Sequence, residues 1–222
     1  MNPAPPINST RPTWRHPDII AAVSATRVAG NVYDKYESAN PFVRRLMASF
    51  LAALDTLVDD AAPDSVLDVG CGEGIVTRRL ARAAGGRVVG LDVESPRLRA
   101  AWAAAGEGVE YVVGDAQTLP FGDDEFDLVS LVEMLQLVED PGRAVEEAAR
   151  VARSAVIVTV PHEPLWRALN VARGAYLRDL GDTPGHLHHW SRRAIVDLVA
   201  ARAPIVSVRS AVPWTLILAR PG

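Results

Sequence analysis

The sequence is poor in several features that mark whole classes of protein. Its 222 residues include one cysteine, Cys71, so an internal disulfide is excluded and a reducing compartment is expected. Lys35 is the only lysine and the net charge is −4, so the sequence lacks the clustered basic residues that nucleic acid or anionic membrane requires. No stretch reaches the roughly 18 apolar residues of a membrane span, and the proline-rich residues 1–16 lack the apolar run of a signal peptide. We therefore expect a cytoplasmic protein that binds neither nucleic acid nor membrane.

The middle of the chain alternates between apolar strands and helices. Five strands are predicted, at 65–69, 87–92, 109–115, 126–132 and 155–160. Apolar, β-branched runs separated by helices are typical of a parallel sheet that is covered on both faces. Two later runs, "IVSVRS" and "WTLILA", are separated by only three residues, which is too short for a parallel crossover, so they should form an antiparallel hairpin at one edge. The sequence thus predicts a Rossmann-like, doubly wound α/β fold.

Further segments flank this alternating core. We expect residues 1–16 to be a flexible tail and residues 17–222 to form one domain, which begins with helices over 17–60. After the fifth strand, residues 161–190 form an insertion that is rich in aromatic side chains and carries four of the five histidines. This insertion follows the carboxyl end of a strand, which is where open α/β sheets bind their ligands.

The stretch "VLDVGCGEG" places a glycine-rich loop directly after the first strand. Gly70, Gly72 and Gly74 tolerate positive φ and carry no Cβ, so the backbone can approach a ligand closely. The helix that follows presents its positive end to the same place. A tight strand-to-helix turn without a ligand is the alternative interpretation. The third glycine comes one residue earlier than in the dinucleotide fingerprint G-x-G-x-x-G, which disfavours a nicotinamide cofactor.

An acidic residue ends each of the first three strands. Asp68 ends the first strand, and Asp92 ends the second, where a carboxylate can accept both ribose hydroxyls of an adenosine. Asp115 ends the third strand and can meet an adenine amino group. Each acid could instead be a helix cap or a surface residue, but three in succession favour an adenosine ligand.

Four stretches in order, "VLDVGCGEG", "GLDVES", "GDAQTLPF" and "FDLVSLVEMLQLVEDP", resemble the successive motifs of class I S-adenosylmethionine-dependent methyltransferases. The resemblance covers residues 64–160 and implies a seven-stranded sheet with S-adenosylmethionine as the cofactor. In this family pattern, Asp68 and the loop 70–74 would hold the methionyl amine and carboxylate, and Asp92 would hold the ribose. The implied adenine contacts are Asp115, the Ala116 backbone and Val93.

The resemblance also implies two further contacts. Glu133, just past the fourth strand, would lie near the methyl-bearing sulfur. Tyr33 and Tyr36 are similar to an N-terminal aromatic segment that closes over the cofactor in this family, although simple helix packing is an equal alternative for them.

The usual general base of the family is absent from its usual place. Many relatives carry Glu-His after the fourth strand, where this chain has Gln136-Leu137. Candidates for the base must therefore come from elsewhere, and the 161–190 insertion offers histidines, which suit proton abstraction near neutral pH. Among them we prefer His186 and His189, because a spacing of three can put both on one face of a helical turn. The predicted acceptor contacts are His162, Trp166, Tyr176, His188 and Trp190. Structural roles in stitching the loop or in packing are the alternative for these residues, and no cysteine or paired acid completes a metal site, so no metal is expected.

These observations predict a methyltransferase that acts on a small molecule, first of all on a saccharide or natural-product hydroxyl. The insertion "PHEPLWRALNVARGAYLRDLGDTPGHLHHWS" resembles a segment of actinobacterial small-molecule methyltransferases, some of which act on saccharide hydroxyls. N- or C-methylation of a secondary metabolite is one alternative, and a non-catalytic S-adenosylmethionine-binding protein is another. The expected partner is the small-molecule acceptor, and the chain is expected to be a monomer or a homodimer.

Overall fold

The computed structural model describes residues 40–172 and 179–222. The predicted tail, the start of the predicted N-terminal helices, and Tyr33, Tyr36 and Tyr176 lie outside these residues. The roles assigned to them stay predictions.

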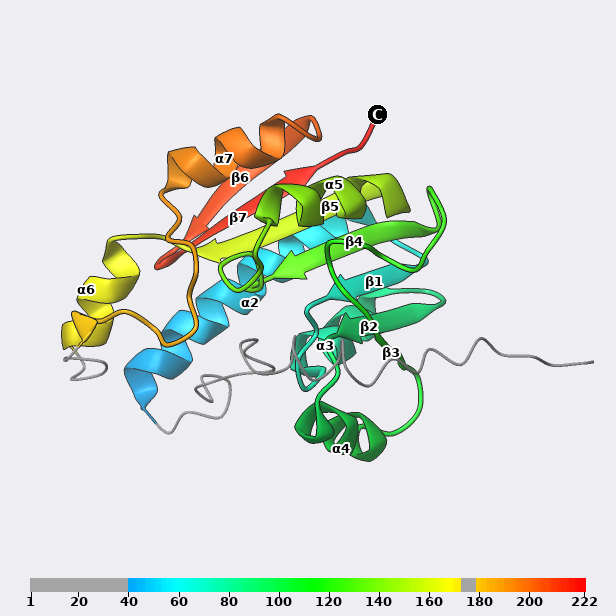
Figure 1. Cartoon of the computed structure of the whole chain (residues 1–222), viewed down its shortest axis with the longest axis horizontal. Helices are drawn as coiled ribbons and strands as arrows, with labels where there is room; N and C mark the ends of the chain where they lie inside the picture. Colours follow the sequence, from blue (N-terminus) through cyan, green and yellow to red (C-terminus); the bar gives the residue numbers. More distant parts are fainter. Residues whose placement is uncertain (1–39, 173–178) are drawn as a thin grey trace, which may run out of the picture.

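Within the described residues, seven strands form one sheet in the order β3-β2-β1-β4-β5-β7-β6 (Figure 1). The strands are β1 (Val66–Val69), β2 (Val88–Asp92), β3 (Glu110–Val113), β4 (Phe126–Val132), β5 (Ala152–Pro161), β6 (Ile205–Ala211) and β7 (Trp214–Ala219). β7 runs antiparallel to both of its neighbours, and the other pairs are parallel. The predicted α/β fold, with an antiparallel hairpin at one edge, is confirmed. The strand order reverses between β1 and β4, which is the place where such sheets bind their ligands.

Helices cover both faces of this sheet. They are α2 (Pro41–Ala61), α3 (Ile75–Ala83), α4 (Pro96–Ala104), α5 (Pro141–Val151), α6 (Leu165–Ala172) and α7 (Arg192–Ala200). α2 and α3 pack on one face and α5 and α7 on the other (Figure 1). Three of these helices begin at a residue whose side chain caps the helix by accepting a hydrogen bond from a backbone N–H of the first turn. The N-cap bonds are Phe42 N to Asn40 Oδ1 in α2, Arg143 N to Asp140 Oδ1 in α5 and Ala194 N to Ser191 Oγ in α7.

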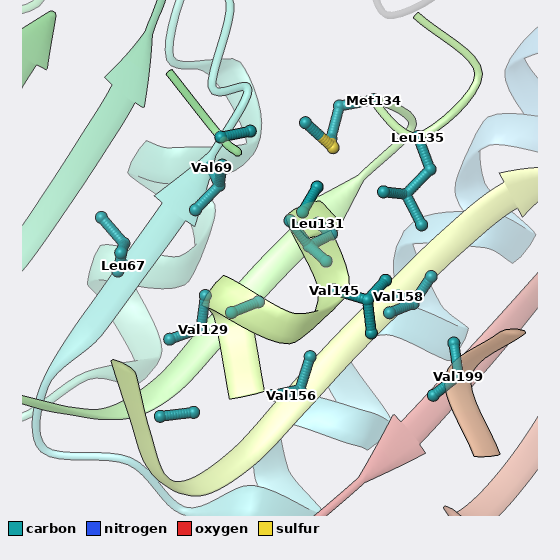
Figure 2. Packing of buried hydrophobic residues seen from close by; sticks show 14 of the residues in the cluster. Leu67, Val69, Val129, Leu131, Met134, Leu135, Val145, Val156, Val158 and Val199 are labelled. Atoms are coloured by element: carbon teal, nitrogen blue, oxygen red, sulfur yellow. The ribbon is translucent and has the colours of Figure 1, made fainter. Parts of the chain in front are cut away.

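Because both faces are covered, the central strands are mostly apolar. Alternate residues of β1, β4 and β5 point to the α5/α7 face, where Val145 of α5 and Val199 of α7 cover them (Figure 2). The residues between them, such as Val66 and Leu128, point to the α2 face. This two-sided burial explains the mainly apolar runs that predicted a parallel sheet.

The carboxyl ends of β1 to β5 lie at the same edge of the sheet, because these strands are parallel to one another. The turn between β6 and β7 lies there too, since Pro161 at the end of β5 pairs with Trp214 at the start of β7. Figure 1 shows α6 and the segment 179–191 beyond the tips of β4 and β5. Among the described residues, no helix combines the length and the apolar character that crossing a membrane requires.

Candidate functional site

The glycine-rich loop joins β1 to α3 at the switch point of the sheet. Gly70, Gly72 and Gly74 all have positive φ, at 73°, 54° and 76°. A Cβ on Gly70 would lie 2.6 Å from the Cβ of Met134, and a Cβ on Gly74 would overlap the Tyr111 hydroxyl. Two of the three glycines are therefore required by the fold itself, in addition to leaving bare backbone for a ligand.

Asp68 lies in β1 beneath this loop and is almost completely buried, with 1% of its surface exposed. Its Oδ2 accepts a hydrogen bond from Thr77 Oγ1 and its Oδ1 accepts one from Ser130 Oγ, each at 2.7 Å. Burial raises the pKa of Asp68 to about 6, although the two hydroxyl bonds lower it. The nearby Asp92 carboxylate raises it further.

Asp92 ends the neighbouring strand β2 and braces the same loop. Its Oδ2 accepts from Gly72 N and its Oδ1 from Val93 N, both at 2.7 Å. Burial raises the pKa of this carboxyl too, against the effect of the two N–H donors. Each oxygen keeps a second lone-pair direction, so a carboxylate held in this way can still accept hydrogen bonds from a ligand.

Asp115 and Ala116 follow β3, the next strand along the edge. Asp115 Oδ1 accepts from Gln117 N at 3.0 Å and from Gln117 Nε2 at 3.2 Å, so this acid also shapes its own turn. Because β3, β2 and β1 are neighbours in the sheet, the three acids at their ends follow one another along one edge, as predicted.

Three residues around the loop were not among those predicted from the sequence. Two of them are Thr77 and Ser130, and the hydroxyl of Ser130 within the mainly apolar strand "FDLVSLV" is a usable signal. Trp102 of α4 donates from Nε1 to Gly72 O at 2.8 Å, and its ring stacks on Tyr111 with centroids 5.2 Å apart. A single tryptophan in an alanine-rich helix was the signal for this contact.

The end of β4 carries an unusual backbone at Glu133, whose φ is 58°. A left-handed conformation costs a non-glycine residue about 1–2 kcal/mol, and here hydrogen bonds hold it: Glu133 N donates to Thr159, and Gln136 Nε2 donates to Glu133 O at 2.6 Å. Met134 lies between the end of β4 and Val69 of β1 (Figure 2). Strained backbone held by its surroundings is common at functional sites.

Residues 186–190, which we call the histidine loop, are tied across the ends of β4 and β5. Leu187 N and His188 N donate to Gln136 O, and Glu163 N, just past β5, donates to Trp190 O at 2.9 Å. The loop is not helical, so the helical turn that the spacing suggested is wrong. The rings of His186 and His189 nevertheless lie close together, with centroids 6.3 Å apart.

The histidines of this region differ in what they contact. His188 Nε2 bonds to Val138 O at 3.0 Å, which stitches the loop to the segment after β4. His189 Nε2 bonds to Asp182 Oδ1 at 2.8 Å. His162, by contrast, is held through its backbone, whose N–H donates to Pro213 O at 2.7 Å. Within residues 40–172 and 179–222, no group of His, Cys, Asp and Glu is arranged to hold a metal ion.

The two described tryptophans that were predicted to meet the acceptor also pack the insertion onto the sheet. Trp166 donates from Nε1 to Thr183 Oγ1 at 3.0 Å, and its ring lies 5.7 Å from that of Trp214. Trp190 is buried and its ring lies 5.7 Å from that of His188. The packing role is therefore seen directly, and the acceptor contact stays a prediction.

Comparison with known proteins agrees with this geometry. Residues 67–159 match a family described as "Methyltransferase domain". This segment, which is less than half of the chain, is thus similar to that family. The cofactor of such a domain is S-adenosylmethionine. The matched segment contains the glycine loop, the three strand-end acids and the end of β4.

The chain is also similar to curated proteins that are named for different acceptors. A probable tocopherol O-methyltransferase of Oryza sativa is 39% identical over 123 residues, or 51% of this chain and 34% of that protein. A norajmaline N-methyltransferase of Rauvolfia serpentina is 32% identical over 111 residues, or 46% of this chain and 38% of that protein. The chain thus spans about a third of the length of these two relatives.

A solved structure shows the same fold over more of the chain. The S-adenosylmethionine-dependent methyltransferase of Mesorhizobium loti has a TM-score of 0.61 and 19% identity. The match covers 78% of this chain and 97% of that one, so the likeness in fold extends beyond residues 67–159 to the surrounding elements.

Proposed function

We propose that this chain transfers the methyl group of S-adenosylmethionine to a small molecule, at a hydroxyl oxygen of a saccharide or natural product. The observation that carries the proposal is a continuous connection between two loops. Met134 packs on Gly70 of the glycine loop, and Gln136, two residues on, binds the backbone of the histidine loop. A loop with proton-accepting side chains is thereby fixed beside the proposed cofactor site.

The described residues suit this cofactor. Asp68 offers a buried carboxylate to the methionyl ammonium, and Asp92 offers its remaining lone pairs to the ribose hydroxyls. Asp115, Ala116 and Val93 would contact the adenine. When bound, the sulfonium makes its methyl carbon electrophilic, so the protein's task is to align the acceptor and exclude water, which can supply roughly 7–11 kcal/mol.

Replacing Asp92 by alanine should raise the dissociation constant of S-adenosylmethionine at least about tenfold, because hydrogen bonds to a charged acceptor are worth about 1.5–3 kcal/mol each. Isothermal titration calorimetry measures this directly. Asp127→Ala is the matched control, since Asp127 accepts from Ser65 at the amino end of β1, away from the site. An unchanged dissociation constant for Asp92→Ala would contradict the ribose role.

Gln136 supports an acceptor that carries an O–H or N–H group. The residue is only 4% exposed, and its Oε1 is buried with no hydrogen-bond partner among the described residues. The amide cannot simply turn over, because its Nε2 donates to Glu133 O. An unmade hydrogen bond at a buried carbonyl costs about 1–3 kcal/mol, so a ligand with a donor is favoured, and O- or N-methylation ranks above C-methylation.

For the base we propose His189, oriented by Asp182. A carboxylate that accepts from Nε2–H fixes the tautomer in which Nδ1 is the proton acceptor. Nδ1 would then take the proton of the acceptor hydroxyl while the methyl group moves to oxygen. His186 lies beside this ring and is the second candidate, and Glu133 remains the residue proposed nearest the sulfonium.

We expect His189→Ala to lower kcat about 10²–10⁴-fold and to leave the affinity for S-adenosylmethionine unchanged. Asp182→Asn should lower kcat less, because the imidazole loses the carboxylate that orients it. His188→Ala should mainly lower the melting temperature, since that ring bonds to backbone. Turnover that survives replacement of all three histidines of the loop would contradict a base in this loop.

The whole proposal is tested by incubating the protein with methyl-labelled S-adenosylmethionine and a fractionated small-molecule extract. Label in a saccharide or other hydroxyl-bearing product supports the proposal, and label on nitrogen or carbon supports the corresponding alternative. Cofactor binding without label in any fraction would support the non-catalytic alternative.

A further inference from the structure

Two hydroxyl groups, from Thr77 and Ser130, donate hydrogen bonds to the carboxylate of Asp68. Thr77 comes from α3 and Ser130 from β4, so the two donors approach the carboxylate from different elements. Both side chains are fully buried and each takes one carboxylate oxygen at 2.7 Å. A hydroxyl can donate to an ionised carboxylate or accept from a protonated one, so this contact responds to the charge of Asp68.

Asp68 is not neutralised by a cation from the described residues. The strongest charge that acts on it is another carboxylate, Asp92 at the end of β2. Cys71 in the loop and Tyr111 on β3 face it as neutral groups, because burial raises the pKa of both. The charged groups nearby are engaged elsewhere: Glu73 pairs with Arg97, and Arg78 donates to Glu73 O.

We propose that Thr77 and Ser130 are positioning residues that keep Asp68 ionised and aimed at the ammonium group of S-adenosylmethionine, so that cofactor binding depends on both hydroxyls and weakens when Asp68 takes up a proton. The inference rests on the proposed cofactor role of Asp68. It adds two residues outside the glycine loop to the binding machinery and makes the affinity depend on pH.

The pKa of Asp68 is consistent with the two hydroxyl hydrogen bonds. Burial raises the pKa of Asp68 to about 6, and the two hydroxyl bonds are what hold it that low. The carboxylate is therefore mainly ionised at neutral pH and becomes protonated just below it. Loss of either hydroxyl removes a bond that favours the ionised form, so protonation would begin at a higher pH.

The test compares two ligands over about pH 5 to 8, because this range includes the pKa of about 6 of Asp68. S-Adenosylhomocysteine carries the ammonium, whereas 5′-methylthioadenosine lacks the whole amino-acid end. For the wild-type protein, the dissociation constant of S-adenosylhomocysteine should rise about tenfold for each pH unit below about 6 and be flat above it. The dissociation constant of 5′-methylthioadenosine should not change with pH.

Thr77→Val keeps the shape of the side chain and removes the hydroxyl, whereas Thr77→Ser keeps the hydroxyl. We expect Thr77→Val and Ser130→Ala to weaken S-adenosylhomocysteine about tenfold at neutral pH and to move the pH midpoint upward. Thr77→Ser should behave like the wild type. Ser65→Ala, which removes a hydroxyl bonded to Asp127 at the other edge of the sheet, controls for the general loss of a Ser–Asp bond.

All dissociation constants are measured below the melting temperature of the least stable variant, so that unfolding does not enter. The inference is overturned if wild-type binding of S-adenosylhomocysteine is independent of pH, or if Thr77→Val and Thr77→Ser behave alike. If neither ligand binds the wild-type protein, the proposed cofactor site fails and the inference falls with it. If both ligands bind without any dependence on pH or on the hydroxyls, the inference alone fails.

Discussion

Replacing Asp68 by asparagine should make the ligand-free protein more stable while abolishing detectable binding of S-adenosylmethionine. Burial raises the pKa of Asp68 from 3.8 to about 6, so the folded protein binds a proton more tightly than the unfolded chain does. Stability therefore falls as the pH rises between these two values, and above about pH 6 the ionised carboxylate costs about 3 kcal/mol. Asparagine carries no charge at any pH, and one hydroxyl can turn to accept from its amide N–H.

The measurement is the melting temperature of the ligand-free proteins as a function of pH. For a chain of this length each kcal/mol corresponds to about 2–4 °C, so Asp68→Asn should melt several degrees higher at neutral pH. The difference should vanish towards pH 4, where the wild-type carboxyl is protonated as well. Asp127→Asn is the opposite control, because Asp127 pairs with Arg153 near the surface and its loss should lower the melting temperature. A lower melting temperature for Asp68→Asn, or retained affinity, would refute this account.

Gly70→Ala should destabilise the protein and remove cofactor binding together. The added methyl would lie 2.6 Å from Met134 Cβ and 3.0 Å from Met134 Cγ, and the residue would keep a φ of 73°. The left-handed conformation costs about 1–2 kcal/mol and overpacking about 1–3 kcal/mol more. Because the Cβ of Met134 moves only with its backbone, the strain passes to the segment between Glu133 and Gln136.

Gly106→Ala separates the cost of the left-handed backbone conformation from the cost of overpacking against Met134. Gly106 has a φ of 80°, but no atom lies within 4 Å of a Cβ built there. Chemical denaturation of both variants should show the smaller loss for Gly106→Ala, with normal binding of S-adenosylmethionine. Equal losses in the two variants would mean that contact with Met134 contributes nothing.

The sheet was predictable because its signal is local and repeated. Because the strands are covered on both faces, they appear as apolar runs in any short stretch of the sequence. The three-residue link before Trp214 is compatible only with a hairpin. The strand-end acids were predictable for the same reason, since parallel strands bring Asp68, Asp92 and Asp115 to one edge without any knowledge of side-chain contacts.

What the sequence did not reveal are contacts between distant positions. Ser130 meets Asp68 from 62 residues away, and Arg143 or Arg150 would have been as plausible a partner for a buried acid. The histidine loop also depends on contacts between distant positions. The sequence predicted that a helical turn would bring His186 and His189 together, but the loop is held instead by hydrogen bonds to Gln136 and Glu163. Pairing of this kind depends on the packed sheet, which no local pattern encodes.

The contact between Trp102 and the glycine loop has an optical consequence. An indole that donates to Gly72 O and stacks within 6° of parallel on Tyr111 has an emission that depends on both neighbours. Any ligand that shifts the loop carbonyl would change the intensity or wavelength of that emission. Trp102 is therefore a native fluorophore beside the loop, and titrations of this site need no attached dye.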